Sequence, residues 1–410
     1  MSFNIAVEGG KSVRLLTAGK YCDRDIVVTA EGGGYAPVAE KDVNFYDYDG
    51  TLLYSYTVEE AQALAELPPA PTPPKDFLVF EEWNWTLAQI KDYNDPVQVG
   101  AIYKPVDNNT RAVIQIDEDW QKEVVIRYKQ WSSTVTINWG DGSAEESTTD
   151  SSGKAFTLTH TYPVKENYVI TVKMVGTWDL GHGTATTPFF GNLTTENGSM
   201  ALREVYLGGK ARVLSYAFYK ARKLNTATLS KTQTAILSYG FRDSLIKAIV
   251  VPSTLTSIGY AAFYYAKKLN VCSLSPSVAT IEPEQFNSSI VRILTIPKKV
   301  ATMRLYCTYC EKIVLKSGLT EIGQSCFSGV ERMTELTIPE TVTSIGTTAF
   351  KDNYSMLRLR FLPATPPTVA NSNAFTGIPA NCVVEVPAAS LEAYKNATNY
   401  GTIAAQMVGV

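Results

Sequence analysis

Three sets of residues in this 410-residue chain have the types and spacing that chemistry requires. Asp47 and Asp49 lie two residues apart before Gly-Thr, and paired carboxylates can act as nucleophile, acid or base. Cys307 and Cys310 have the CxxC spacing of a redox or zinc site, and His160 is the residue best suited to acid–base work. Each set acts only if the fold brings further groups to it.

The segment from Asp47 to Thr51 resembles the DxDGT motif of haloacid-dehalogenase phosphotransferases. The resemblance implies attack on phosphorus by Asp47 and acid catalysis by Asp49. Such enzymes need the motif at the end of the first strand of a doubly wound sheet, with a later lysine and an acidic pair near Mg²⁺. The chain instead continues into LPPAPTPP and then into all-β sequence. The favoured interpretation is a hairpin turn, with the phosphatase as its rival.

A repeat of 20–23 residues organises the second half of the chain. The segment from Leu336 to Asn353 recurs upstream in degenerate copies. Its phenylalanine slot is filled by Phe218, Phe241, Phe263, Phe286, Cys307, Phe327 and Phe350. Each copy has an apolar pattern that predicts a short strand with alternate side chains inward, followed by a turn. Such a period predicts a solenoid whose units are stabilised by stacking on their neighbours.

The copies LTIPETVTSIGTTAF, VVPSTLTSIGYAAF and GLTEIGQSCF resemble leucine-rich repeats of the BspA-like type, from about Leu202 to the C-terminus. The resemblance implies a repeat solenoid from a family whose members are mostly surface-binding proteins with varied ligands. The last segment is similar to the terminal unit of such proteins. It predicts a strand at 382–386 and a capping helix with Leu391 and Tyr394 facing inward.

The repeat register gives the CxxC pair a structural interpretation. Cys307 occupies a phenylalanine slot and Cys310 a strand slot, both of them inward positions. The chain has no second CxxC and only two histidines. Because free cysteine packs as a small hydrophobe, we predict two buried free thiols. Free thiols suit a chain that folds in a reducing cytoplasm.

Residues 106–178 alternate in the manner of strands and predict a β-sandwich. The run from Trp139 through Asp141 to Ser143, with the later His160-Thr-Tyr162, resembles the hallmark of Ig-like PKD domains. Trp139 would anchor the core, and Asp141 would cap the turn amides. Because no serine or cysteine nucleophile motif accompanies it, His160 is predicted to be a hydrogen-bonded structural residue.

The upstream residues predict two smaller modules. Residues 1–34 have the pattern of short strands, and GKSVRLLTAGKYCDRDIVVTA is similar to N-terminal segments of phage and prophage tail and fibre proteins of gut Gram-positive bacteria. That similarity implies an attachment module. Residues 35–105 predict a mixed module with a proline-rich connector, which Trp83 and Trp85 would pack onto the sandwich. Residues 179–200 predict a linker to the solenoid at 201–410.

Charge is distributed unevenly along the chain. Residues 201–320 carry 17 Lys and Arg against 5 Asp and Glu, a net of +12, whereas residues 1–200 carry 15 against 28, a net of −13. A basic surface raises the local concentration of anionic partners. The sequence has neither a run of about 18 apolar residues nor an N-terminal pattern that predicts a secretory signal.

Tyrosines and basic residues crowd one side of the early repeats, while outward strand positions form a separate ladder-like face. Aromatic rings beside Lys and Arg suit a sugar ring and an anionic group. The candidate ligand-binding residues are Tyr216, Tyr219, Tyr239, Tyr264, Tyr265, Lys267, Lys268, Lys298, Lys299, Arg304 and Tyr309. The alternative is that many of these tyrosines pack between repeats and the lysines keep the surface soluble.

We therefore predict a mainly β, multi-domain, non-enzymatic protein without cofactor or metal. The predicted function is that of a phage or prophage tail fibre or receptor-binding protein, made in the bacterial cytoplasm, whose repeat domain binds a bacterial surface glycan or anionic wall polymer. Its N-terminal module would contact other virion tail or baseplate proteins, and by analogy with fibres it would form a homotrimer. Neither nucleic acid nor membrane is an expected partner. The alternative is a bacterial cell-surface adhesin or host-interaction leucine-rich-repeat protein.

Overall fold

The computed structural model describes residues 4–6, 12–14, 41–131, 134–174, 176–191, 200–305 and 307–410. The chain divides into two compact units, Met1–Glu40 and Lys41–Val410. In the first unit, β1 (Asn4–Ala6) pairs antiparallel with β2 (Ser12–Arg14). The rest of the predicted attachment module at 1–34 lies outside the described residues.

Residues 41–105, called the docked module below, form a mixed sheet with the strand order β4-β3-β6-β5 and two short helices. The elements are β3 (Val43–Tyr46), β4 (Leu52–Tyr56), α1 (Val58–Ala63), β5 (Leu78–Trp83), α2 (Leu87–Tyr93) and β6 (Val97–Pro105). Each helix begins at a threonine that caps the third amide after it, while Glu60 or Gln89 reaches back to the cap backbone. These capping boxes explain why helices start here within otherwise β-rich sequence.

Two facing sheets follow, and both continue into the repeats. One has the order β10-β9-β12-β7-β15-β17 and the other β11-β8-β13-β16, with β14 paired to β8. The strands are β7 (Thr110–Gln115), β8 (Glu123–Gln130), β9 (Thr134–Asn138), β10 (Glu146–Thr149), β11 (Lys154–Thr161), β12 (Asn167–Met174), β13 (Thr177–Leu180) and β14 (Phe190–Gly191), with a 3₁₀ turn at Asp119–Gln121. Because β7 pairs with β15 and β13 with β16, this sandwich covers the first edge of the solenoid.

Part of the predicted linker belongs to this core. Within the described part of 179–200, Phe189 and Phe190 are buried, and β14 pairs with β8. The turn-rich composition predicted an exposed connection. The two aromatic side chains instead fill the junction between sandwich and repeats, where Phe189 contacts both Trp178 and Phe218.

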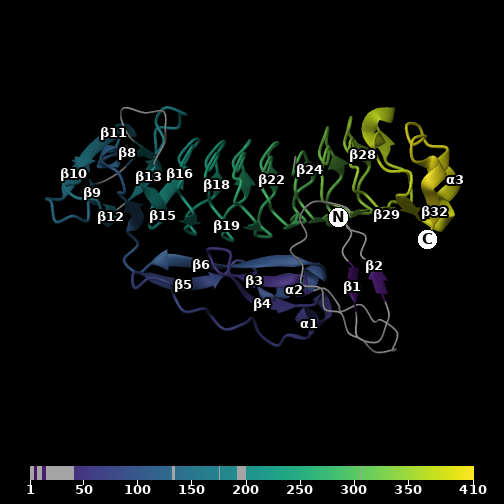
Figure 1. The fold of residues 1–410 in the computed structure, drawn as a ribbon, viewed down its shortest axis with the longest axis horizontal. Helices are drawn as coiled ribbons and strands as arrows, with labels where there is room; N and C mark the ends of the chain where they lie inside the picture. Colours follow the sequence, from purple (N-terminus) through teal and green to yellow (C-terminus); the bar gives the residue numbers. More distant parts are fainter. Residues whose placement is uncertain are drawn as a thin grey trace. The chain divides into compact units, whose positions relative to one another are not determined.

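The solenoid is built from coils that each contribute one strand to each of two parallel ladders (Figure 1). The first ladder contains β15 (Leu202–Tyr206), β17 (Thr226–Thr228), β19 (Ala248–Val250), β21 (Val271–Ser273), β23 (Ile293–Thr295), β25 (Lys312–Val314), β27 (Glu335–Ile338), β29 (Arg358–Phe361), β31 (Val383–Val386) and β32 (Met407–Gly409). The second contains β16 (Lys210–Val213), β18 (Ala235–Ile236), β20 (Ser257–Ile258), β22 (Thr280–Ile281), β24 (Thr302–Met303), β26 (Glu321–Ile322), β28 (Ser344–Ile345) and β30 (Thr368–Val369).

The predicted fold class is confirmed: the protein is mainly β, with 34% strand and 9% helix, and its repeats form a solenoid of about nine turns. The phenylalanine slots face inward and stack from coil to coil, as between Phe241 and Phe263 at 5.8 Å and between Phe327 and Phe350 at 5.4 Å. At the end, 3₁₀ turns (Ser372–Phe375, Ala388–Ser390, Ala404–Gln406) and α3 (Leu391–Lys395) close the core. Tyr394 is fully buried there, as predicted, and Leu391 is partly buried.

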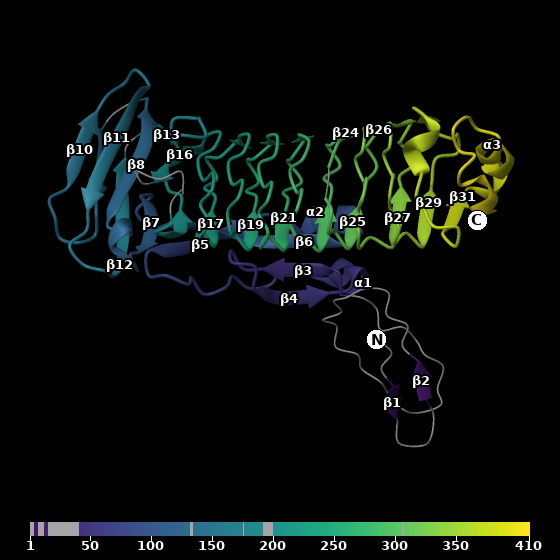
Figure 2. The same cartoon turned by 45° about the horizontal axis from the view of Figure 1, so that its top comes forward.

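The docked module lies against the outward face of the first ladder. Its central strand β6 packs on β17, β19, β21 and β23 (Figure 2). Asn84 Nδ2 donates hydrogen bonds to the Val251 and Ser273 carbonyls at 3.0 and 3.1 Å, and Trp85 Nε1 donates to the Leu274 carbonyl at 2.9 Å. The prediction that Trp85 joins the module to the sandwich is therefore wrong, because its indole finds its partner on the solenoid.

Gly100 shows how closely the module and the solenoid approach. A Cβ atom at this position would lie 2.4 Å from Val250 Cγ1, so only glycine allows β6 to come this near. Ser273 and Thr295, which point outward from the ladder, are buried and donate to module carbonyls of Gln98 and Pro96. The early half of the ladder-like face is thus an interior surface.

Charge complementarity accompanies this packing. Carboxylates of the docked module pair with lysines of the basic stretch, namely Glu82 with Lys231, Asp92 with Lys298, Asp42 with Lys312, and Asp95 with Lys316. The net charge of +12 is therefore partly neutralised within the protein. The cations that remain available to a partner lie on other sides of the coils.

Candidate ligand-binding site

The turn that carries the phenylalanine slot has the same backbone geometry in successive coils. Two residues before the phenylalanine and two after it have positive φ, as at Tyr239 (61°) and Asp243 (59°) around Phe241. Alternate amides then donate to the next coil, for example from Tyr239 to Tyr260 and from Phe241 to Ala262. These hydrogen bonds fix the side chains of successive coils in columns along one edge.

Tyrosines occupy this edge in the first three coils, those of Phe218, Phe241 and Phe263. Tyr216 and Tyr239 stack at 4.7 Å with 20° between their planes, although both have positive φ, of 62° and 61°. A bulky residue in this region costs on the order of 1 kcal/mol or more. Later coils place Ser325 and Thr348 at the same position. The fold thus needs the backbone conformation there, but it does not need tyrosine.

Arg242 is the centre of the cluster. Its guanidinium carbon lies over the rings of Tyr219 at 5.7 Å, Tyr239 at 5.4 Å and Tyr264 at 4.8 Å. Tyr219 and Tyr264 come from the coils on either side, so the cation is sandwiched along one column. Asp243 is its nearest carboxylate, 3.7 Å from Nε. The Arg242 guanidinium donates no hydrogen bond to any described residue, and its Nε is buried.

Two further cations lie beside this centre. Lys220 Nζ is 5.2 Å from the Tyr219 ring, and Lys267 Nζ is 5.3 Å from the Tyr265 ring. Tyr265 is 38% exposed and is in contact with Tyr264. We call this surface, formed by the six tyrosines and three cations of the first three coils, the tyrosine–arginine edge. Its members are Tyr216, Tyr219, Lys220, Tyr239, Arg242, Tyr260, Tyr264, Tyr265 and Lys267.

Three tyrosine hydroxyls at this edge are held in the protonated form by their surroundings. Burial raises the pKa of Tyr216 and of Tyr264, and burial together with the neighbouring Glu284 raises the pKa of Tyr260. The edge can therefore offer ring faces, hydroxyl donors and guanidinium donors at once. That combination suits a sugar ring that carries an anionic group.

The structure brings together about half of the predicted site. Tyr216, Tyr219, Tyr239, Tyr264, Tyr265 and Lys267 lie at the edge, and Lys268 is exposed next to Lys267 in sequence. Sequence reasoning missed Arg242, although the repeat register could have found it, because it occupies the column position of Tyr219 and Tyr264.

The other predicted residues lie elsewhere. Lys298 pairs with Asp92 and lies 4.9 Å from the Tyr93 ring, so the docked module occupies it. Lys299 is exposed beside it, at the turn between the two ladders. Arg304 is exposed two coils beyond Lys267, and Tyr309 lies under Arg332 at 5.8 Å. Spacing in sequence placed these residues near the tyrosines, whereas the coil geometry separates them.

The paired carboxylates form a hairpin turn, as predicted. Asp47 N donates to the Thr51 carbonyl at 2.8 Å, and Asp49 Oδ1 accepts from the Thr51 amide at 2.9 Å. The turn joins β3 to β4 in the docked module. Burial raises the pKa of Asp47. The strand that precedes the motif is not part of a doubly wound parallel sheet, which the phosphatase interpretation required.

His160 has the predicted structural role. Its Nε2 lies 2.7 Å from Asp141 Oδ2, its ring stacks on Trp139 at 4.8 Å, and Tyr162 donates to the Trp139 carbonyl. Asp141 also accepts from the Ser143 amide. These contacts tie the turn after β9 to the end of β11.

We expect Asp141→Asn to lower the free energy of unfolding by about 1–2 kcal/mol at pH 7. Burial alone would raise the pKa of Asp141, but hydrogen bonds from Ser143 and His160 outweigh it and lower the pKa to about 2. Stability from this carboxylate is therefore complete above about pH 5 and is lost as the pH falls towards 2. Urea unfolding across this range should show the variant and the wild type converging at pH 2. The exposed Asp76→Asn is the control, and a pH-independent difference would contradict the assignment.

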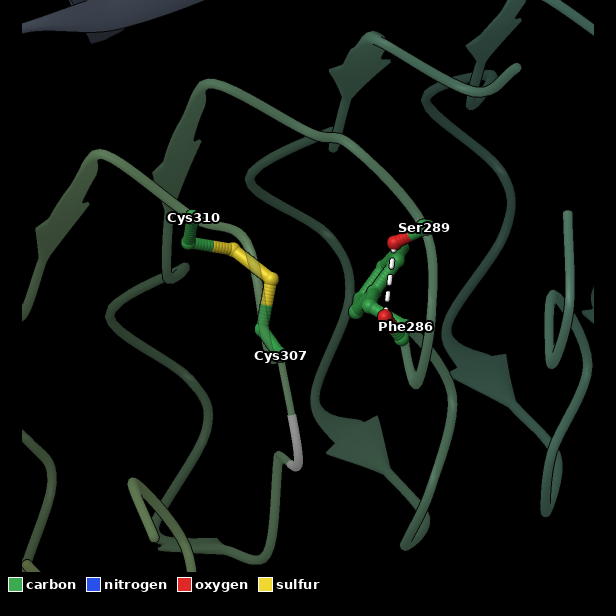
Figure 3. The surroundings of a disulfide bond; sticks show 4 residues. All are labelled: Phe286, Ser289, Cys307 and Cys310. Atoms are coloured by element: carbon green, nitrogen blue, oxygen red, sulfur yellow. Dashed lines mark hydrogen bonds between the residues drawn. A yellow bond between two sulfur atoms is a disulfide. The ribbon is translucent and has the colours of Figure 1, made fainter. Parts of the chain in front are cut away.

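The prediction of two free thiols in the CxxC pair is wrong. Cys307 and Cys310 form a disulfide inside their coil, with Cα atoms 5.8 Å apart (Figure 3). The register placed both side chains inward correctly, but with both on one short turn they reach each other. The bond fills the slot beside Phe286 where the phenylalanine stack is interrupted. Cys272, Cys326 and Cys382 are buried free thiols, and burial raises the pKa of Cys326 to about 12.

Alkylation of the unfolded, unreduced protein tests this pairing. Peptide mass spectrometry should find Cys272, Cys326 and Cys382 labelled, and Cys307 and Cys310 labelled only after reduction. Buried thiols become accessible on unfolding, whereas a disulfide does not react with an alkylating agent. Labelling of Cys307 without reductant would show that the pair is a dithiol.

A metal site and a membrane-spanning helix are both absent from the described residues. No group of three or more His, Cys, Asp or Glu side chains there could hold a metal ion. No helix in the same part of the chain is long and apolar enough to span a bilayer.

Comparison with known proteins agrees with this geometry in the repeats. The sequence model described as BspA type leucine rich repeat region matches residues 210–310 and 303–397, in six copies. Residues 210–397 are thus similar to BspA-type leucine-rich repeats. The tyrosine–arginine edge lies in the first coils of this region. None of the curated proteins compared with the chain matches it.

Several solved structures are similar to part of this chain. A leucine-rich repeat protein from Bacteroides ovatus is 18% identical, with a TM-score of 0.38 over 44% of this chain and 50% of that one. A leucine rich cell surface protein from Faecalibacterium prausnitzii is 21% identical, with a TM-score of 0.33 over 48% and 63%. A leucine-rich repeat protein from Eubacterium ventriosum is 18% identical, with a TM-score of 0.24 over 45% and 65%. This chain therefore spans between half and two thirds of the length of these proteins.

Proposed function

We propose that the chain is a non-enzymatic repeat protein of the bacterial cell surface that binds a surface glycan or other anionic polymer through its tyrosine–arginine edge. One observation carries this proposal: the Arg242 guanidinium is held over three tyrosine rings and donates no hydrogen bond to any described residue. The Arg242 side chain is 32% exposed, so an anionic ligand can reach it and accept the hydrogen bonds that the protein does not.

Location at the cell surface has support of its own. The BspA-type repeats suit a surface-binding protein, and the Cys307–Cys310 disulfide suits a compartment more oxidising than the cytoplasm. The disulfide removes the argument for cytoplasmic folding that free thiols had provided. Both observations favour an adhesin over a phage or prophage tail fibre.

The tail-fibre function, its trimer and its virion partners stay predictions. They depend on the first hundred residues, and most of residues 1–40 lie outside the described residues. Residues 41–105 pack on the solenoid through Asn84 and Trp85. This packing gives the docked module a structural role that needs no virion partner.

We expect Arg242→Gln to weaken binding to bacterial cells or purified wall polymers by about 10- to 100-fold, because hydrogen bonds to charged groups contribute about 1.5–3 kcal/mol. Binding of the full chain would be measured at rising salt, with loss of affinity as salt screens the anion. Lys299→Gln is the matched control, since it removes an exposed charge from another side of the coils. Binding that is absent in the wild type, or equal in Arg242→Gln, would reject the proposed function.

A further inference from the structure

The tyrosine–arginine edge offers one stacked cation in each of three successive coils. Lys220 lies over Tyr219 in the first coil, Arg242 over its three rings in the second, and Lys267 over Tyr265 in the third. A cation held over an aromatic face loses part of its conformational freedom before any ligand arrives. One charge lies in each successive coil along the solenoid axis, and its contact with a ring restricts its position before a ligand binds.

The coil step sets the advance along the solenoid axis from one of these coils to the next. The phenylalanine rings below them are 5.0 Å apart between Phe218 and Phe241, and 5.8 Å apart between Phe241 and Phe263. Two such steps, at the usual separation of neighbouring strands, extend over about 10 Å. A single phosphate or carboxylate is therefore too short to meet all three cations. A chain with an anionic group on each successive unit can meet all of them.

The site ends after the third coil. In the fourth coil, that of Phe286, the register positions of Arg242, Lys220 and Lys267 are filled by Asn287, Ser288 and Ile290, and none of these is a cation. Before the first coil, Phe189 of the sandwich junction packs against Phe218. Asp243, which is 25% exposed and 3.7 Å from Arg242 Nε, occupies in the second coil the register position that Lys220 has in the first, so the second coil presents its cation one position earlier. The run of coils that each carry a cation stacked on a tyrosine ring is thus three coils long.

We infer that the ligand of this edge is a linear polyanion of sugar or polyol units that runs parallel to the solenoid axis, with three consecutive anionic groups bound by Lys220, Arg242 and Lys267. The inference rests on the proposed function and adds the direction, the minimal length and the charge pattern of the ligand. The tyrosine rings between the cations provide faces on which the neutral parts of each unit can pack.

Isothermal titration of the full chain with oligomers of defined length tests the inference. The probes are oligogalacturonates of one to six units, glycerol-phosphate oligomers of the same lengths, and neutral malto-oligosaccharides. We expect affinity to rise several-fold with each anionic unit up to three units and then to level off, because each added unit meets one further cation. Preference for one anionic series would identify carboxylate or phosphodiester as the source of the charge. Neutral oligomers should bind at least tenfold more weakly.

Two neighbouring lysines provide the matched pair of variants. Lys267→Gln should lower the affinity for trimers about five- to tenfold and leave that for dimers nearly unchanged. Lys268→Gln removes the same charge one residue further along, where no ring lies beneath it among the described residues, and should have less than a twofold effect. Circular dichroism of both variants would verify the fold.

The outcomes separate the two proposals. Wall binding that depends on Arg242, together with equal affinity for monomers and trimers or equal effects of the two lysine variants, would overturn the polyanion inference alone. Absence of binding to walls and to every oligomer would overturn the proposed function as well.

Discussion

Replacing Trp85 by alanine is expected to lower the free energy of unfolding by about 3–5 kcal/mol, the usual cost of removing a fully buried large aromatic side chain. The indole is 1% exposed, packs edge-on against Tyr93 at 4.6 Å and donates to the Leu274 carbonyl. Its loss leaves a cavity between the docked module and the solenoid and an unpaired carbonyl. Chemical denaturation followed by intrinsic fluorescence and circular dichroism would measure the change.

Two variants make this experiment specific. Trp85→Phe keeps most of the ring but removes the hydrogen bond to Leu274, and should cost about 1–3 kcal/mol. Val79→Ala, at a 38% exposed position on β5 of the same module, should change stability by less than about 0.5 kcal/mol. If Trp85→Ala unfolds at the same denaturant concentration as the wild type, packing of the module does not stabilise the solenoid.

The second large effect is expected in the phenylalanine stack. Phe263→Ala should lower the free energy of unfolding by about 3–5 kcal/mol, because the ring is completely buried between Phe241 at 5.8 Å and Phe286 at 5.6 Å. The cavity would interrupt a core that runs continuously from the sandwich to the C-terminal cap. Since each coil is stabilised mainly by its neighbours, the loss should affect both sides of the stack.

Phe263→Leu is the control for shape, and should cost less than half as much because most of the volume is kept. Thermal unfolding by calorimetry would compare the three proteins. A loss below 1 kcal/mol for Phe263→Ala would mean that the coils around this slot collapse onto the vacancy. The phenylalanine stack would then be able to repack around a missing ring.

The sequence did not show that the docked module covers part of the outward face of the first ladder. An outward strand position has the same alternation whether water or another sheet covers it. A weaker signal was present: outward residues of the early coils are small or apolar, such as Val250 and Ser273, while those of later coils are charged, such as Arg358 and Arg360. This contrast marks the half of the ladder that the docked module covers.

The basic stretch is a similar case. Counting charges located it correctly, but the count contains no information on pairing. Lys298 was included in the candidate site because it is basic and close in sequence, whereas Asp92 of the docked module neutralises it from 206 residues away. Lys267, which looks equivalent in sequence, lies instead over Tyr265 on another side of the coil.

The sequence by itself determined the solenoid, its inward residues and its cap, because a period of 20–23 residues requires every coil to bury the same slots against its neighbours. It also determined the turn at Asp47 and the structural role of His160, which depend on local geometry. Only the tertiary structure decided what covers the first ladder, how the CxxC pair is bonded, and which cation the tyrosines surround. Those outcomes depend on distances between residues far apart in the chain or on opposite sides of a turn, and a linear pattern does not contain them.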